Sequence, residues 1–129
     1  MRFTASILVS IALSAAASAE PSKSPDADID FLITSAAKDF GLRHPPTSVR
    51  FRQVRIGRIP LSEGEIQPLL CGYFQTLKAQ WVPFATIKTS DYEQWTGATA
   101  KSFCENVSVV WVDDLDLTSR LQRTFDAPR

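Results

Sequence analysis

The chain has 129 residues with 14 basic and 14 acidic side chains, so its formal net charge is zero at neutral pH. This balance argues against a nucleic-acid-binding protein, whose affinity depends on many phosphate contacts by lysine and arginine. The length suits one domain with a modest core, which a covalent cross-link would help to stabilise.

The first 19 residues have the pattern of an export signal. Arg2 gives a positive start, residues 7–13 form a short apolar run, and residues 17–19, Ala-Ser-Ala, match a cleavage site. The run is too short for a membrane span, which needs about 20 residues, and no later segment is apolar enough to cross a membrane. We therefore expect a signal peptide that is removed after Ala19. The expected destination is a Gram-negative periplasm, with secretion beyond the envelope as the alternative.

The mature chain is expected to begin with a disordered segment, residues 20–25, which is polar and contains two prolines. Residues 26–129 are then expected to form a single domain. Its first helix is predicted over residues 25–40, with Ser24 as the N-cap and Gly41 at the C-terminal end. Apolar residues recur through it at helical spacing: Ile29, Leu32, Ile33, Ala36 and Phe40.

Residues 48–57 predict a strand with an irregularity. In a regular strand Val49 and Phe51 would face one side, whereas Val54 and Ile56 would face the other. One extra residue near positions 52–53, a β-bulge, would bring all four apolar side chains to the same side.

The same bulge would turn Arg50 and Arg55 outward, with Arg52 or Gln53 beside them. These side chains would then form a cationic stripe for an anionic partner, such as a glycan, a lipid head group or an acidic protein face. The simpler interpretation is a solvated strand whose charges protect a sheet edge.

A loop is predicted over residues 57–65, followed by a hairpin of two strands, residues 69–77 and 81–89. Both strands carry apolar residues on both faces, so both faces need cover. Pro83 lacks the N–H that a central strand requires, so it predicts a sheet edge or a bulge.

The two cysteines, Cys71 and Cys104, predict one disulfide, because an even count in an exported protein favours pairing. The alternative is a reactive thiol, which needs a nearby base or cation. The only histidine, His44, lies far from both cysteines in the sequence.

A capping-box pattern at Ser90 and Glu93 predicts a second helix that runs toward Cys104, with a possible break at Gly97. Residues 107–112 are apolar and β-branched, which favours a central strand, and residues 120–125 predict a short final helix. The expected order is α-β-β-β-α-β-α. It indicates an α+β fold in which a mostly antiparallel sheet of about four strands packs with two to three helices.

Three carboxylates follow the predicted central strand: Asp113, Asp114 and Asp116. Paired carboxylates can act as general acid and base or bind a hard cation. The simpler role is to cap the last helix. The sequence offers neither a zinc-binding cluster nor a phosphate-binding glycine loop, so no metal and no cofactor is expected.

Several aromatic residues remain as candidates for a binding surface, foremost Tyr73, Trp81 and Phe84. Phe51-Arg52, then Cys71-Gly72, then an aromatic strand that ends near Phe84 resemble a group of small, exported proteobacterial proteins. The pattern of that group is Phe-Arg, then Cys-Gly-Glu-Val-Asn, then a glycine-rich turn and a Phe. This chain has Tyr73 in place of the Glu and Gln75 in place of the Asn, and the glycine-rich turn is absent or shortened. The resemblance implies a small envelope protein and transfers no functional residues.

We therefore expect a periplasmic, non-enzymatic protein that binds an envelope protein or a cell-wall glycan, in one form as an inhibitor or immunity-type protein. The sequence leaves its oligomeric state open. The expected binding residues are Arg50, Arg52, Arg55, Tyr73, Trp81 and Phe84. The alternative is a small secreted hydrolase that uses the aspartate cluster of residues 113–116, together with His44 or Glu105.

Overall fold

A computed structural model describes residues 25–43, 49–75, 80–112 and 115–128. The predicted signal peptide and His44 lie outside these residues, as do Asp113 and Asp114. No helix in the described part is long and apolar enough to cross a membrane. The elements in chain order are α1 (Pro25–Arg43), β1 (Arg50–Pro60), a 3-10 turn η1 (Ser62–Gly64), β2 (Ile66–Gln75), β3 (Trp81–Lys88), β4 (Tyr92–Thr96), α2 (Ala98–Cys104), β5 (Val110–Trp111) and α3 (Thr118–Asp126).

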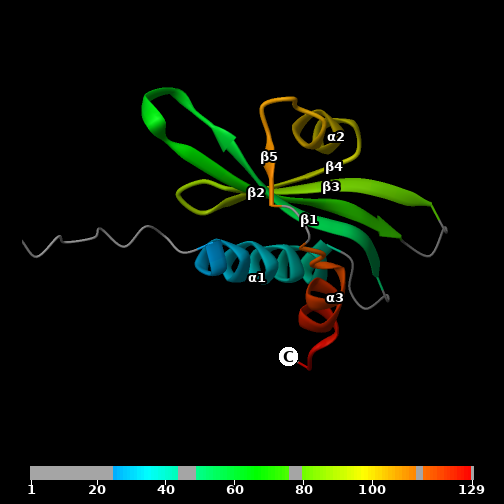
Figure 1. The fold of residues 1–129 in the computed structure, drawn as a ribbon. Helices are drawn as coiled ribbons and strands as arrows, with labels where there is room; N and C mark the ends of the chain where they lie inside the picture. The colour runs from blue at the N-terminus through cyan, green and yellow to red at the C-terminus, as the bar shows by residue number, and fades with distance from the viewer. Residues whose placement is uncertain (1–24, 44–48, 76–79, 113–114, 129) are drawn as a thin grey trace, which may run out of the picture.

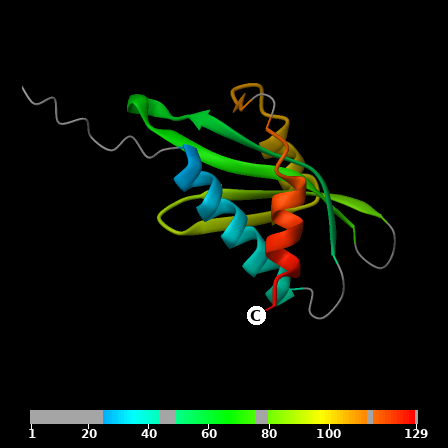
Figure 2. The same cartoon turned by 60° about the horizontal axis from the view of Figure 1, so that its bottom comes forward.

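The strands form one antiparallel sheet in the order β4-β3-β2-β1-β5. The helices α1 and α3 lie against one face of the sheet, and α2 lies on the other (Figures 1 and 2). We call these the helix-covered face and the outer face. The predicted α+β class and the antiparallel sheet are confirmed, with five strands rather than about four.

The main core lies between the helix-covered face and the helices α1 and α3. Phe40 of α1 is its centre, since the ring lies 4.9–5.1 Å from the rings of Phe51, Phe74 and Phe84. A smaller core lies under α2 on the outer face. There the predicted disulfide joins Cys71 of β2 to Cys104 of α2, with 6.0 Å between the Cα atoms.

The predicted bulge in β1 is confirmed. Arg52 pairs with Tyr73 and Arg55 with Cys71, so three residue steps on β1 match two on β2. Gln53 takes the extra position with a positive φ of 52°, which non-glycine residues seldom adopt. As a result Val49, Phe51, Val54 and Ile56 are all buried in the main core.

The free edge of β1 beside the bulge is covered by side chains of α3. Gln122 accepts a hydrogen bond from the backbone N–H of Phe51 and donates one to the carbonyl of Val49. The hydroxyl of Thr118 accepts the backbone N–H of Val54. These bonds satisfy backbone groups that would otherwise be free to pair with a strand of another molecule.

The helix predicted from Ser90 to Cys104 is wrong in its first half, because residues 92–96 form the edge strand β4. Side chains alternate along a strand, and those of Tyr92 and Gln94 both point inward. The Tyr92 hydroxyl donates to Asp39 of α1 at 3.1 Å, and Gln94 accepts from the Thr86 hydroxyl at 2.6 Å. Gly97, with a φ of 74°, separates the strand from α2.

The central strand predicted over residues 107–112 is also wrong. Only Val110 and Trp111 form a strand, β5, which lies at the sheet edge, and Val107 is fully exposed. The predicted loop over residues 57–65 begins too early, because β1 continues to Pro60. Gly57 lies so close to β5 that a Cβ there would be 2.8 Å from the ring of Trp111.

Two further boundaries differ from the prediction. The helix α1 continues past Gly41 to Arg43, whose guanidinium forms an ion pair with Asp39 at 2.9 Å one turn earlier. The hairpin of β2 and β3 is confirmed, with Gln75 opposite Trp81. Pro83 lies at a local edge as predicted, because the β4 pairing begins only at Phe84.

Candidate functional site

The helix α2 leaves part of the outer face uncovered (Figure 1). The bulge divides β1 so that Arg50, Arg52 and Arg55 all lie on this face. Their partners on β2 are Gln75, Tyr73 and Cys71, and Cys71 marks the face because it is bonded to α2. Beyond β2, the corresponding positions on β3 are Trp81, Pro83 and Ala85.

Arg52 stacks on two aromatic rings. Its guanidinium carbon lies 5.4 Å from the ring centre of Tyr73 and 4.3 Å from that of Trp81. An exposed cation over an aromatic ring is stabilised by about 0.5–1 kcal/mol. The register explains the contact, since Tyr73 lies directly opposite Arg52 and Trp81 lies one row away. Thus three of the predicted binding residues form one cluster.

Arg55 stacks in the same way on Trp111, with 3.6 Å between the guanidinium carbon and the ring centre. The sequence did not identify this contact, because it depends on β5 lying beside β1 at Gly57. The side chains of Arg52 and Arg55 are exposed, although each rests on an aromatic ring.

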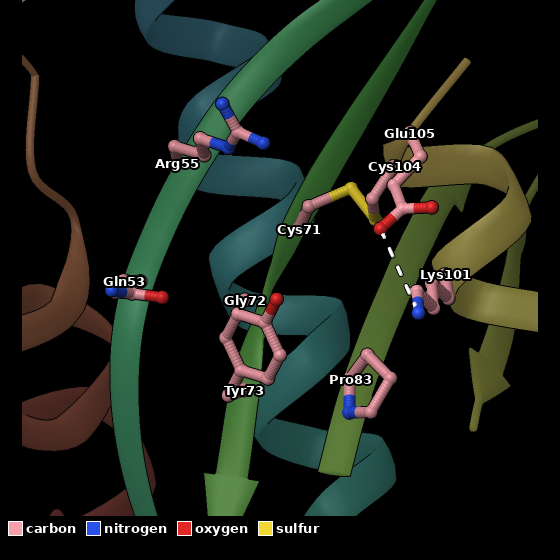
Figure 3. A pocket seen from close by; sticks show the side chains of 9 residues that line it. All are labelled: Gln53, Arg55, Cys71, Gly72, Tyr73, Pro83, Lys101, Cys104 and Glu105. Carbon is pink, nitrogen blue, oxygen red and sulfur yellow. Dashed lines mark ion pairs between the residues drawn. A yellow bond between two sulfur atoms is a disulfide. The ribbon is translucent and has the colours of Figure 1, made fainter. Parts of the chain in front are cut away.

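A hollow of about 380 Å³ lies beside this row of side chains (Figure 3). Figure 3 shows Arg55 and Gln53 on the β1 side, Lys101 and Glu105 on the α2 side, and the disulfide between them. Its lining residues are Gln53, Arg55, Cys71, Gly72, Tyr73, Pro83, Lys101, Cys104 and Glu105. Tyr73, Pro83 and the disulfide supply apolar surface. The charged side chains of the lining are Arg55, Lys101 and Glu105.

A second, shallower hollow of about 440 Å³ lies on the β5 side of β1. Gln53 and Arg55 line both hollows, so these two residues form the wall between them. Gln53 is also one of two non-glycine residues with a positive φ in the described part of the chain; the other is Glu63 in the turn η1. Residues held in rare backbone conformations gather at functional sites, which directs attention to this position.

The charges of the site are unbalanced. Among the residues that the structure describes, none of the three arginines has a carboxylate within ion-pair distance. Lys101 and Glu105 of α2 lie 3.9 Å apart as an exposed pair. The uncovered part of the outer face is therefore cationic, and its guanidinium groups have N–H donors to spare.

One predicted binding residue must be reassigned. Phe84 is 0% exposed and packs against Phe40 in the main core, so it stabilises the fold and offers no surface to a partner. Strand alternation places it on the helix-covered face, opposite to its neighbour Pro83. Arg50 is exposed on the outer face, at the N-terminal end of the row of arginines. Gln75 of β2 lies opposite it, and Trp81 of β3 lies opposite Gln75.

The described part of the aspartate cluster has a structural role. Asp116 accepts the backbone N–H of Thr118 at 2.9 Å, at the start of α3. Hydrogen bonds from the hydroxyl and the backbone of Thr118 lower the pKa of Asp116 below its usual value. A general acid needs the opposite shift. No group of three or more potential metal ligands occurs among the described residues.

Comparisons with known proteins give no relative to extend these observations. No protein-family model, curated protein or solved structure matches the chain. The functional argument therefore depends on the geometry of the outer face.

Proposed function

We propose that the protein is an exported, non-enzymatic binding protein that recognises an anionic group on a partner in the cell envelope. The outer face provides the contact, through Arg50, Arg52 and Arg55. One observation carries this proposal: Arg52 is held against Tyr73 and Trp81 and has no acidic partner in the described part of the chain.

Stacking prepares the guanidinium for an anion. A free arginine side chain loses about 2 kcal/mol of rotamer entropy when it is fixed, and the planar group binds carboxylate or phosphate through two parallel hydrogen bonds. Arg52 and Arg55 are already partly fixed by their rings, so less of this entropy is lost on binding.

The export part of the proposal is supported by the signal-like residues 1–19 and by the disulfide. Disulfides persist in oxidising compartments such as the periplasm. Mass spectrometry of protein recovered from a periplasmic extract tests this part. We expect a chain that begins at Glu20, and a chain that retains residues 1–19 would contradict it.

Titration with two anionic polymers, polyglutamate and polygalacturonate, tests the binding part. We compare wild type with Arg52→Gln/Arg55→Gln, and with the matched control Lys38→Gln/Arg123→Gln, which removes two exposed cations from α1 and α3. If each exposed arginine contributes about 0.5–1 kcal/mol, the site variant loses about tenfold in affinity. The control stays near wild type.

The dependence of binding on salt concentration and on the polymer shows whether charge drives the binding. Binding between exposed charges weakens as ionic strength rises, because the Debye length shortens. Failure of both polymers to bind at low salt would overturn the proposal. An equal loss in the two variants would also overturn it, because the effect would then follow net charge and not this face.

A further inference from the structure

The three arginines of β1 are evenly spaced. Their partners on β2, Gln75, Tyr73 and Cys71, are alternate residues of a regular strand. With a rise of about 3.3–3.4 Å per residue, the backbone positions of the arginines repeat at roughly 6.7 Å. Their side chains lean to different sides of β1, that of Arg52 toward Trp81 of β3 and that of Arg55 toward Trp111 of β5. The repeat therefore matches the backbone of a partner, whose long acidic side chains reach to either side of β1. The bulge is essential to this spacing, because a regular β1 would turn Arg55 to the helix-covered face.

An extended polypeptide has the same repeat. Its side chains point to one side at every second residue, with the same rise per residue. We infer that the partner is an extended acidic segment of a protein with carboxylates at three alternate positions, aligned along β1 so that each carboxylate meets one arginine. This inference rests on the proposed function and specifies the chemistry of its partner.

The hollow lies beside Arg55 and Tyr73, and its volume of about 380 Å³ is large enough to admit an acidic side chain of the partner. Tyr73, Pro83 and the disulfide offer apolar contact to its methylene groups, while Arg55 and the amide of Gln53 offer donors to its carboxylate. Lys101 and Glu105 on the α2 side form an ion pair at 3.9 Å, so together they add no net charge to the hollow. The next position of β1 on the outer face is Gly57, which has no side chain, so the acidic row of the partner is expected to end at this hollow.

The aromatic rings favour a polypeptide over a glycan. A sugar ring stacks on an open aromatic face, whereas here guanidinium groups lie over Tyr73, Trp81 and Trp111. The exposed recognition groups are thus the N–H edges of arginine, which match carboxylates in planar geometry.

Two peptides of identical composition test the spacing. One alternates, Ser-Glu-Ser-Glu-Ser-Glu-Ser, and the other has a block, Ser-Ser-Glu-Glu-Glu-Ser-Ser, both with blocked ends. In an extended block peptide only the first and third glutamates share a side, so one arginine contact is lost. We expect the alternating peptide to bind the wild-type protein about two- to fivefold more tightly, which corresponds to about 0.5–1 kcal/mol for the one contact.

Variants locate the effect. Arg55→Gln removes the third contact, so it should reduce the preference for the alternating peptide to near unity, whereas Arg123→Gln should leave the preference unchanged. Circular dichroism and thermal unfolding establish that each variant is folded. Because the readout is a ratio of two affinities for one variant, a general loss of stability does not produce it.

The outcomes separate this inference from the proposed function. Equal affinity for the two peptides would overturn the spacing while the anion-binding function stands. Binding of polygalacturonate without either peptide would overturn the polypeptide partner in favour of a glycan, and the function would again stand. Absence of binding to every anionic probe would overturn both.

Discussion

Removal of the disulfide should destabilise the protein strongly. The bond joins Cys71 and Cys104, which are 33 residues apart in sequence, so it closes a loop that contains β3, β4 and most of α2. In the chain-entropy treatment, a loop of this length restricts the unfolded chain by about 3–4 kcal/mol. That is a large part of the 5–15 kcal/mol that typically stabilises a domain.

Urea unfolding followed by tryptophan fluorescence and circular dichroism measures this loss. We compare the oxidised wild type with its reduced form and with Cys71→Ala/Cys104→Ala. The free energy of unfolding should fall by about 3–4 kcal/mol in both, and the slope with urea should rise because the unfolded chain expands. Reducing agent should leave the double variant unchanged, which is the control.

Hydrogen exchange locates the damage. The helix α2 has seven residues, too few to persist alone in water, and the disulfide fixes its last residue to β2. Its amides should lose protection in the reduced protein before those of α1 do. A loss of stability below about 1 kcal/mol, with an unchanged slope, would refute the loop-closure reasoning.

Three other predictions test the fold and the assignment of side chains. Phe84→Ala should lower the free energy of unfolding in urea by about 3–5 kcal/mol because Phe84 is fully buried. Trp81→Ala should lower it by only about 1 kcal/mol because that ring is half-buried. Equal losses would contradict the assignment of Phe84 to the core and of Trp81 to the binding surface. Gly72→Ala should lower the free energy of unfolding by about 1–3 kcal/mol, because a Cβ would lie 2.9 Å from the ring of Phe84 and 3.0 Å from Val54. A variant as stable as wild type in thermal unfolding would argue against this packing. Burial raises the pKa of the Tyr92 hydroxyl above its usual 10.0, and the hydrogen bond to the carboxylate of Asp39 raises it further. The resulting stability is present below pH 10.0 and falls as the pH rises further, so stability curves of wild type and Tyr92→Phe should diverge in slope only in that alkaline range.

The sequence was most informative where apolar side chains left one solution. The bulge in β1 followed from four apolar residues that only an extra residue could bring to one face, and the structure has it between Arg52 and Arg55. The disulfide followed from the count of cysteines. Both arguments depend on local spacing or on residue number, so neither required knowledge of the tertiary fold.

The sequence was misleading where tertiary contacts outweighed local preference. Residues 90–93 match a helix start, yet Tyr92 and Gln94 gain buried partners on α1 and β3 only as a strand. Residues 107–112 are rich in β-branched residues, yet α2 is attached to the outer face by the disulfide, and only Val110 and Trp111 reach the sheet, at its edge.

The stacked arginines could be predicted only in part. The outward direction of both Arg50 and Arg55 followed from the predicted bulge, and Tyr73 and Trp81 were named as candidates for a binding surface. The contacts of Arg52 with Trp81 and of Arg55 with Trp111 depend on the register between strands. Periodicity within a single strand carries no information on that register.

The most direct test of the central claim is a map of the anion-binding surface by NMR. Amide and indole signals of the isotopically labelled protein are followed as polyglutamate is added at low salt. We predict that the shifts gather on the outer face, at residues 50–55, at Tyr73, and at the indoles of Trp81 and Trp111. Shifts that gather instead on α1 and α3, or that are spread evenly over the exposed lysines and arginines, would contradict the claim that this face is the binding site.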